Sequence, residues 1–244
     1  MSEIVLENKV EKRKISNEGI ARLEVPIKRI LEQILPSIEA GEYGLIIGDD
    51  ASGRIPALII SHFVGEIYKR KGHHPAPTIF LAGGRHLSSS EKEPKKNKIK
   101  EYLKHRSFEP ISHNKILYVT EAIKTGQGIE MVIEALREYG FAYDIVTTYL
   151  ADTSEKHISS LEDKFKGNLF VGSGDFNDIT GVYGIRRMAG VEKMPRELFA
   201  QPFKKGERGE DQEHTQERIS TSRADANVVL ESLLNWYESQ KQNV

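Results

Sequence analysis

The stretch of sequence that decides the fold is residues 116–128, which reads ILYVTEAIKTGQG. Its first four residues, 116–119, are apolar or aromatic and indicate a buried parallel strand. Thr120 and Glu121 follow as a polar pair, at the point where that strand is expected to end. A glycine-containing turn at 124–128 then leads into a helical pattern of apolar residues, namely Ile129, Val132, Ile133 and Leu136.

This succession of strand, acidic tip, small-residue loop and helix is a phosphate-binding geometry. The N–H groups of the loop and the positive end of the helix dipole both point at an anion held there. A carboxylate at the strand tip would face ribose hydroxyls or a metal ion. The stretch therefore predicts a phosphorylated sugar or a nucleotide as ligand, and the alternative is an ordinary glycine-rich turn of an α/β fold.

A second stretch, residues 44–60, repeats the pattern and reads GLIIGDDASGRIPALII. A short apolar strand ends in the polar turn 48–54, and Pro56 lies in the first turn of the helix, where its missing N–H costs nothing. The turn predicts a second anion site, to which Arg54 would add a charge-assisted contact. The alternative is a plain strand-to-helix turn capped by Ser52.

Taken in this order, the two stretches resemble the type I phosphoribosyltransferase family. Residues 120–128 resemble its signature for 5-phosphoribosyl 1-diphosphate (PRPP), in which two acids precede a Thr-Gly loop. Glu121 matches the second acid, which faces the ribose hydroxyls in the family, and Thr120 replaces the first. The resemblance implies that the following loop binds the 5-phosphate, with Lys124, Thr125, Gly126, Gln127 and Gly128 as its residues.

The turn at 48–54 is similar to the pyrophosphate loop of the same family. The resemblance implies that this loop holds the pyrophosphate of PRPP with Mg²⁺ as cofactor, and that Glu121 and Arg54 act in catalysis. The implied reaction displaces pyrophosphate from PRPP by a nitrogen acceptor, a nucleobase. The pyrophosphate-binding residues are expected to be Asp50, Ala51, Ser52, Gly53 and Arg54, and the sequence assigns no metal ligand.

The rest of the chain alternates expected strands with expected helices. The strands are 44–48, 78–82, 116–120, 144–150 and 168–172, and the helices are 16–40, 56–71, 128–139 and 153–165. This rhythm predicts an α/β fold with a doubly wound, Rossmann-like, mostly parallel sheet of about five strands and flanking helices. Ligands of such sheets bind at the carboxyl ends of the strands, where both predicted phosphate loops fall.

Residues 85–113 are rich in lysine and arginine and lie between the second and third expected strands. Their position matches the mobile loop that closes over PRPP in the family, excluding water and neutralising the developing charge of the pyrophosphate. The candidate cations are Arg85, Lys95, Lys96 and Lys98. A solvated, charged hairpin or helix is the alternative, and contact with nucleic-acid phosphates is a less favoured one.

Residues 172–202 follow the last expected strand and match the position of the hood, the segment that recognises the nucleobase in the family. Tyr183 would stack on a base, and Asp175 would form a hydrogen bond with it. Surface turns are the alternative, because glycine, asparagine and aspartate are the residues that turns require.

The expected domain of 1–202 is followed by a polar linker at 203–222 and by a C-terminal amphipathic helix at 223–241. The helix carries an apolar stripe at helical spacing, and its residues are Ala226, Val229, Leu230, Leu233, Leu234 and Tyr237. Such a stripe must be buried on the domain, on the mate in a dimer or on another protein.

Composition sets the outer bounds. The 244-residue chain has a net charge of −1, which argues against a dedicated nucleic-acid binder, and it has no cysteine, which excludes disulfides and cysteine-based sites. The N-terminal stretch has no signal-peptide core, and no run reaches the ~18 apolar residues of a membrane helix. A cytoplasmic protein without a membrane partner is therefore expected, and the family resemblance implies a homodimer.

Three functions are left open. The first is the phosphoribosyltransferase described above, with PRPP and a nucleobase-like acceptor as substrates. The second is a regulator with the same fold, which senses PRPP or nucleotides and binds nucleic acid or a protein; Thr120 in place of an acid favours altered or lost catalysis. The third is an unrelated α/β enzyme that binds a phosphosugar.

Overall fold

The computed structural model describes residues 14–84, 87–105, 114–175, 191–192, 197–202 and 212–242. Within these ranges, five parallel strands form one sheet in the order β2-β1-β3-β4-β5. Their bounds are Tyr43–Asp49 (β1), Thr78–Leu81 (β2), Lys115–Ile123 (β3), Tyr143–Leu150 (β4) and Asn168–Ser173 (β5). A short antiparallel pair, β6 (Val191–Glu192) and β7 (Gln201–Pro202), lies apart from this sheet. The predicted α/β class and Rossmann-like parallel sheet are confirmed.

The order of the strands reverses between β1 and β3. From β1 the chain moves outward to β2, and it then crosses back over β1 to start β3 on the other side. The loops that follow β1 and β3 therefore lead to helices on opposite faces of the sheet, α3 and α5. In open α/β sheets this switch point is where ligands bind.

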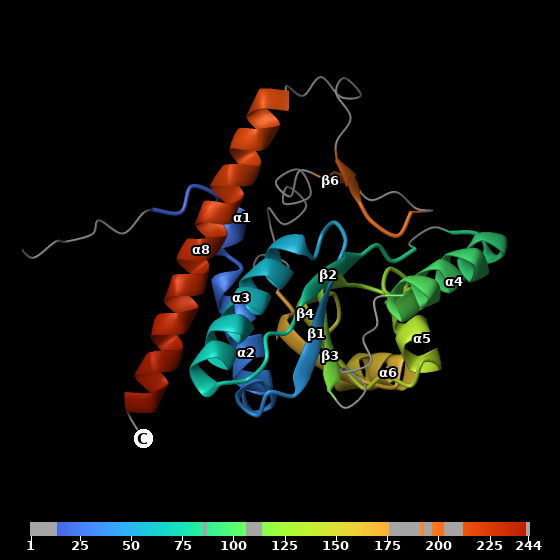
Figure 1. Cartoon of the computed structure of the whole chain (residues 1–244), viewed down its shortest axis with the longest axis horizontal. Helices are drawn as coiled ribbons and strands as arrows, with labels where there is room; N and C mark the ends of the chain where they lie inside the picture. Colours follow the sequence, from blue (N-terminus) through green and yellow to red (C-terminus); the bar gives the residue numbers. More distant parts are fainter. Residues whose placement is uncertain are drawn as a thin grey trace, which may run out of the picture.

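Helices cover both faces of the sheet (Figure 1). One face carries α2 (Glu24–Glu39) and α3 (Arg54–Lys71), with α1 (Glu18–Ala21) and α8 (Gln212–Gln242) packed against them. The other face carries α4 (Ser89–His105), α5 (Glu130–Glu138) and α6 (Glu155–Phe165). Strand side chains alternate between the two core layers: Leu117 and Val119 join the layer of α2 and α3, and Ile116 and Tyr118 join that of α5.

The single helix predicted at 16–40 is two helices, α1 and α2. Pro26 explains the break, because its ring would clash with the carbonyl group of Arg22 in a continuous helix. Asn17 rather than Ser16 caps α1, and its side chain accepts a hydrogen bond from the N–H of Ile20 at 3.3 Å. The predicted bounds of the next helix, 56–71, are close to those observed for α3. The helix starts at Arg54 and is capped at its C-terminal end by Gly72, whose left-handed backbone suits glycine.

The segment 85–113, predicted as a mobile basic loop, contains helix α4, which packs on α5. The alternative of a charged helix is therefore the one observed over Ser89–His105. Ion pairs across the two helices explain it: the ammonium group of Lys96 lies 3.0 Å from a carboxylate oxygen of Glu138 and 3.6 Å from one of Glu134. The glutamates come from a part of the sequence remote from the lysine.

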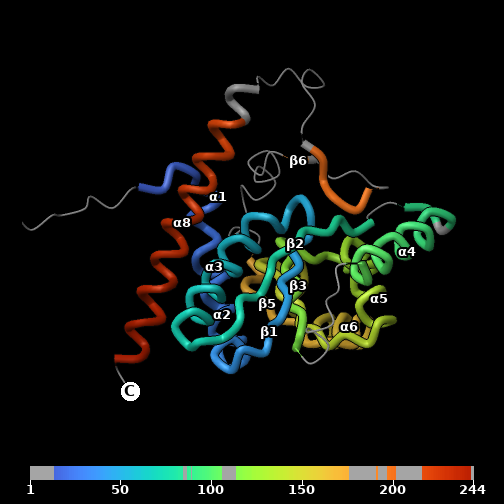
Figure 2. The backbone as a smooth tube through the Cα atoms, in the orientation of Figure 1, coloured from blue at the N-terminus to red at the C-terminus, as the bar shows by residue number. Residues whose placement is uncertain are grey.

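The C-terminal helix starts earlier than predicted. α8 begins at Gln212, so residues 212–222 are helical although their polar composition predicted a linker, and Ser222, the predicted cap, is buried within the helix. Glutamate, glutamine and arginine are strong helix formers, which explains the extension. Figures 1 and 2 show α8 lying along α3 and α1 of its own domain. Phe63 of α3 stacks on Trp236 with 6.4 Å between ring centroids.

Asp225 joins α8 to the start of the described chain. Its buried carboxylate accepts hydrogen bonds from the backbone N–H groups of Ser16 at 3.2 Å and Asn17 at 2.8 Å. In the part of the chain that the structure describes, no helix combines the length and the apolar character needed to span a bilayer.

Candidate functional site

Buried polar side chains gather at the carboxyl ends of neighbouring strands. The middle of each of these strands is mainly apolar, and burying a polar group costs free energy unless it is hydrogen-bonded. The position of the group coincides with the switch point between β1 and β3 and extends toward β5. The residues, all 5% exposed or less, are Asp49 and Asp50 after β1, Thr120 and Glu121 in β3, Thr147 and Thr148 in β4, and Ser173 in β5.

The strand β3 is longer than predicted, so Thr120 and Glu121 lie inside it instead of at its tip. The strand continues because Ala122 and Ile123 pair with β4. Both residues are buried, with Thr120 1% and Glu121 4% exposed. The alternation of faces is interrupted here, because Val119 joins the core layer of α2 and α3 whereas Ile123 joins that of α5.

The loop between β3 and α5 contains backbone N–H groups that have no acceptor in the described part of the chain. Gly126 has φ +75°, a left-handed backbone that favours glycine, and it packs against the ring of Phe165. Among the described residues, no acceptor takes the N–H groups of Thr125, Gly126, Gln127 and Gly128, whereas the N–H of Ile129 donates to the carbonyl group of Gly126. Residues 124–128, called the phosphate loop below, thus include four successive N–H groups without a described acceptor just ahead of helix α5.

The charge at the start of α5 is balanced. Glu130 stands in the first turn, where its carboxylate would repel an anion. Its oxygens lie 3.0 Å from the ammonium group of Lys164 and 3.9 Å from that of Lys92. These two cations offset the repulsion.

Two loops meet at Gly83, which follows β2. A Cβ at Gly83 would lie 1.6 Å from the carbonyl oxygen of Gly128, so the backbones of the two glycines are in direct contact. Lys95 of α4 is 2% exposed, and its ammonium group donates a hydrogen bond to the carbonyl oxygen of Gly83 at 3.0 Å. The buried ammonium group of Lys95 therefore binds Gly83, and Gly83 in turn contacts Gly128 of the phosphate loop.

The four cations predicted for a mobile loop have different surroundings. Lys95 lies beside the meeting point of the two loops, as just described. Lys96 turns away toward Glu134 and Glu138 of α5, and Lys98 is exposed. Arg85 lies outside the described residues.

The turn after β1 is held by a buried ion pair. Asp50 is 0% exposed, and its carboxylate accepts hydrogen bonds from the Nε and Nη2 atoms of Arg54 at 2.5 and 3.1 Å. The guanidinium group also lies over the ring of Phe80, 4.9 Å from its centroid. Arg54, predicted as a catalytic residue, therefore has its charge directed at Asp50, and the peptide between Asp50 and Ala51 is cis.

The other residues of this turn face inward. The hydroxyl group of Ser52 donates to a carboxylate oxygen of Asp49 at 3.3 Å, so Ser52 does not cap α3, whose cap is Gly53. Burial, and then the carboxylates of Asp49 and Asp50, raise the pKa of the Tyr118 hydroxyl well above its usual value. Two buried carboxylates, those of Asp49 and Asp50, thus lie at the switch point between β1 and β3.

The described part of the predicted hood lies against this site. The N–H of Ala200 donates to Asp50 at 2.6 Å, the N–H of Ala82 donates to the carbonyl group of Leu198 at 2.7 Å, and Phe199 contacts Tyr102 edge-on. Asp175 is exposed, and its N–H donates to the hydroxyl group of Ser173. Tyr183 lies outside the described residues.

A metal would find few protein ligands in the described ranges, where no group of three or more His, Cys, Asp or Glu side chains comes together. Magnesium commonly uses one or two carboxylates together with waters and the phosphates of a substrate. Asp49, at the carboxyl end of β1, fits that limited role, whereas Asp50 is already engaged by Arg54 and Ala200.

Sequence reasoning missed three features of this site. The threonines Thr147 and Thr148 interrupt an otherwise apolar strand, and that interruption was a usable signal. The contact of Gly83 with Gly128 could not be read from the sequence, because it joins two loops that are far apart along the chain. The burial of Lys95 also had none, because its neighbours Lys96 and Lys98 have the same chemistry.

Comparisons of the chain with models of protein families, with curated protein sequences and with solved structures find no match. The function must therefore be inferred from the geometry at the carboxyl edge of the sheet.

Proposed function

We propose that this protein binds PRPP at the carboxyl edge of its sheet and transfers the phosphoribosyl group to a nitrogen acceptor, a nucleobase. The observation that carries the proposal is the phosphate loop at the switch point, in which the N–H groups of residues 125–128 have no acceptor among the described residues. A row of backbone donors before a helix is suited to a phosphate group.

Each part of the substrate has a counterpart in this arrangement. The 5-phosphate binds the phosphate loop, and Lys95 adds positive charge from behind Gly83. The ribose lies over the end of β3, where Glu121 and Thr120 supply polar groups. The pyrophosphate lies over the turn after β1, where Asp49 would hold Mg²⁺, and Mg²⁺ supplies neutralisation of the leaving charge. The hood segment at 197–202 flanks the acceptor.

The reaction would proceed by displacement at C1 of the ribose. The nitrogen of the acceptor forms a bond to C1 while the bond from C1 to the pyrophosphate oxygen breaks, and the leaving group keeps the electron pair. Positive charge builds on the ribose ring and negative charge on the pyrophosphate. The protein contributes mainly orientation and electrostatic stabilisation, because the leaving group is already activated.

A second candidate is a regulator that binds PRPP without turnover. Two observations favour it: Thr120 carries no charge and its hydroxyl oxygen has no hydrogen-bond partner among the described residues, and the guanidinium group of Arg54 is occupied by Asp50. Both reduce the charge available for chemistry at the sheet edge while leaving the phosphate loop intact.

The test is calorimetric titration of PRPP into the full-length protein, with and without Mg²⁺. The proposal predicts Mg²⁺-dependent binding that Glu121→Gln weakens about tenfold, as expected for loss of one charge-assisted hydrogen bond. Glu101→Gln, an exposed position on α4, is the matched control and leaves binding unchanged. Absence of binding by folded protein would overturn the proposal.

Pyrophosphate release in the presence of a panel of nucleobases separates the two candidates. Release with any base identifies the transferase. Binding of PRPP without release, over the whole panel, identifies the regulator.

A further inference from the structure

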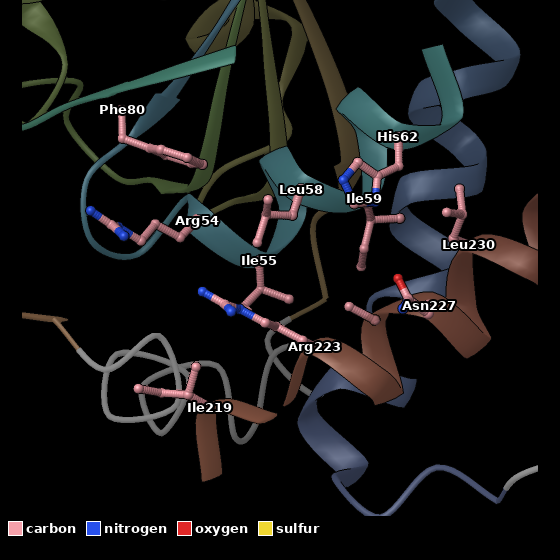
Figure 3. A pocket seen from close by; sticks show the side chains of 11 residues that line it. Arg54, Ile55, Leu58, Ile59, His62, Phe80, Ile219, Arg223, Asn227 and Leu230 are labelled. Atoms are coloured by element: carbon pink, nitrogen blue, oxygen red, sulfur yellow. The ribbon is translucent and has the colours of Figure 1, made fainter. Parts of the chain in front are cut away.

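A pocket between α3 and α8 adjoins the proposed PRPP site, with which it shares only Arg54 (Figure 3). It has a volume of about 280 Å³ and is on the α3 side of the sheet, whereas the phosphate loop leads into α5 on the other side. Figure 3 shows side chains of α3 on one wall and side chains of α8 on the opposite wall. The volume is close to the lower end of the range for small-molecule sites.

The walls of the pocket are mainly apolar. Ile55 and Leu58 of α3 face Leu230 of α8, and both leucines are only half-buried. Apolar side chains that line a cavity without filling it lose packing contacts, which an apolar ligand would restore. The pocket therefore suits a ligand with an apolar body.

The charged groups that line the pocket are cationic. Arg223 is exposed and forms no ion pair with any described residue, and none of the described lining residues is acidic. Arg54 also lines the pocket, but Asp50 balances its charge. His62 and Asn227 add side-chain nitrogens at the rim. A guanidinium group that has no ion pair among the described residues, next to apolar walls, favours an anionic group on the ligand.

We propose that this pocket is a second ligand site, which binds a small organic anion with an apolar body. The apolar part packs between Leu58 and Leu230, and the anionic group contacts Arg223. The proposal does not depend on PRPP binding, because none of the three residues that hold the ligand, Leu58, Leu230 and Arg223, belongs to the proposed PRPP site.

The experiment is a fluorescence titration of the full chain with 8-anilinonaphthalene-1-sulfonate, an aromatic sulfonate that has both chemical parts. The proposal predicts saturable binding with one site per chain. Arg223→Ala weakens it about tenfold through loss of a charge-assisted contact. Asn227→Trp, which places a large ring in the pocket from an exposed position, abolishes it.

Two controls keep the result specific. Arg218→Ala removes another exposed arginine of α8 that does not line the pocket, and it should leave the affinity unchanged. N-phenyl-1-naphthylamine, which lacks the sulfonate, should bind at least about tenfold more weakly. Urea unfolding curves of all variants establish that they are folded.

Three outcomes would overturn the proposal. The first is the absence of saturable binding by the wild-type protein. The second is binding that Arg223→Ala and Asn227→Trp both leave unchanged, which would put the probe elsewhere. The third is equal affinity for the uncharged probe, which would make the pocket a site for apolar groups alone, such as a side chain of a partner.

Discussion

Asp50 and Arg54 form a two-bond ion pair in which the carboxylate is completely buried, with hydrogen bonds of 2.5 and 3.1 Å from the guanidinium group. The pair lies between the end of β1 and the first turn of α3 and also carries Ala200 of the hood segment. It fixes the turn at the carboxyl edge of the sheet and directs the charge of Arg54 at Asp50.

Replacing Arg54 by alanine should therefore destabilise the protein strongly. The buried carboxylate of Asp50 would be left without its counter-charge, and breaking one side of a buried pair costs about 3–5 kcal/mol. Urea unfolding measures the loss. In a double-mutant cycle, Asp50→Ala with Arg54→Ala should cost less than the sum of the single changes.

The matched control for this pair is Arg22→Ala. Arg22 forms an exposed ion pair with Glu18 at the same i,i+4 spacing, and such surface pairs contribute about 0–1 kcal/mol. If Arg54→Ala were as mild as Arg22→Ala, the ion pair would not hold the turn.

Gly83→Ala should disrupt the contact between the β2 loop and the phosphate loop. The added Cβ would meet the backbone oxygen of Gly128 at 1.6 Å, and a backbone atom cannot move away without displacing its loop. We expect a loss of at least about 2 kcal/mol in the free energy of unfolding, together with weaker binding of ribose 5-phosphate.

Gly65→Ala should have the opposite effect on the free energy of unfolding, and it serves as the control for Gly83→Ala. Gly65 lies inside α3, and no heavy atom stands within 4 Å of its added Cβ. Alanine is favoured over glycine in a helix by about 0.5–1 kcal/mol, so this variant should be more stable than the wild type. Equal effects of the two substitutions on unfolding would refute the close contact at Gly83.

Lys95→Met should weaken the binding of ribose 5-phosphate, because it removes the buried ammonium group that reaches Gly83 behind the phosphate loop. We expect about a tenfold increase in Kd, the size of one lost charge interaction. Lys98→Met, three residues away on the same helix but exposed, should leave the Kd unchanged. Calorimetry on folded variants makes the comparison, and an unaltered Kd for Lys95→Met would exclude Lys95 from the site.

Glu39 makes the attachment of α8 sensitive to acid. The hydrogen bond from the Tyr237 hydroxyl, and to a smaller extent the ammonium groups of Lys241 and Lys71, lower the pKa of Glu39 below its usual 4.5. Because the folded-state pKa lies below the unfolded one, the stabilisation is complete above pH 4.5 and is lost as the pH falls through the folded-state value.

Tyr237→Phe should therefore reduce the steepness with which stability falls below pH 4.5. It should also cost about 1–2 kcal/mol near neutral pH, since a hydrogen bond to a charged group is lost. Unfolding free energies measured over a series of pH values give both quantities. Tyr139→Phe, at an exposed tyrosine, should follow the wild-type profile, and an unchanged slope for Tyr237→Phe would contradict the assignment.

The central strands β1 and β3 were predictable because each contains an apolar run buried on both faces, a pattern that depends on local sequence alone. The edge strands β2 and β5 are shorter and only partly buried, but each still contains an apolar stretch between turn residues. The end of β3 was not, because whether Ala122 and Ile123 continue the strand depends on pairing with Tyr149 and Leu150 of β4. A local polar pair, Thr120 and Glu121, was mistaken for the end of the strand.

The same limit applies to the helices and to the site. α4 was predicted as a loop because its lysines find their acidic partners on α5, far along the chain. The loop at 124–128 was predicted between a strand and a helix and is found there, between β3 and α5. Its binding of phosphate stays a prediction. Arg54 was predicted to contact a ligand. The structure instead pairs it with Asp50, four residues earlier, whose burial the sequence does not reveal.

The measurement that tests the central claim most directly is an NMR titration of ¹⁵N-labelled protein with PRPP and Mg²⁺. The account predicts that the amide signals of Thr125, Gly126, Gln127 and Gly128 shift together and saturate at one equivalent of bound ligand, because their N–H groups receive the 5-phosphate. Unchanged chemical shifts of these four amides in folded protein would contradict it, whether other signals shift or none does.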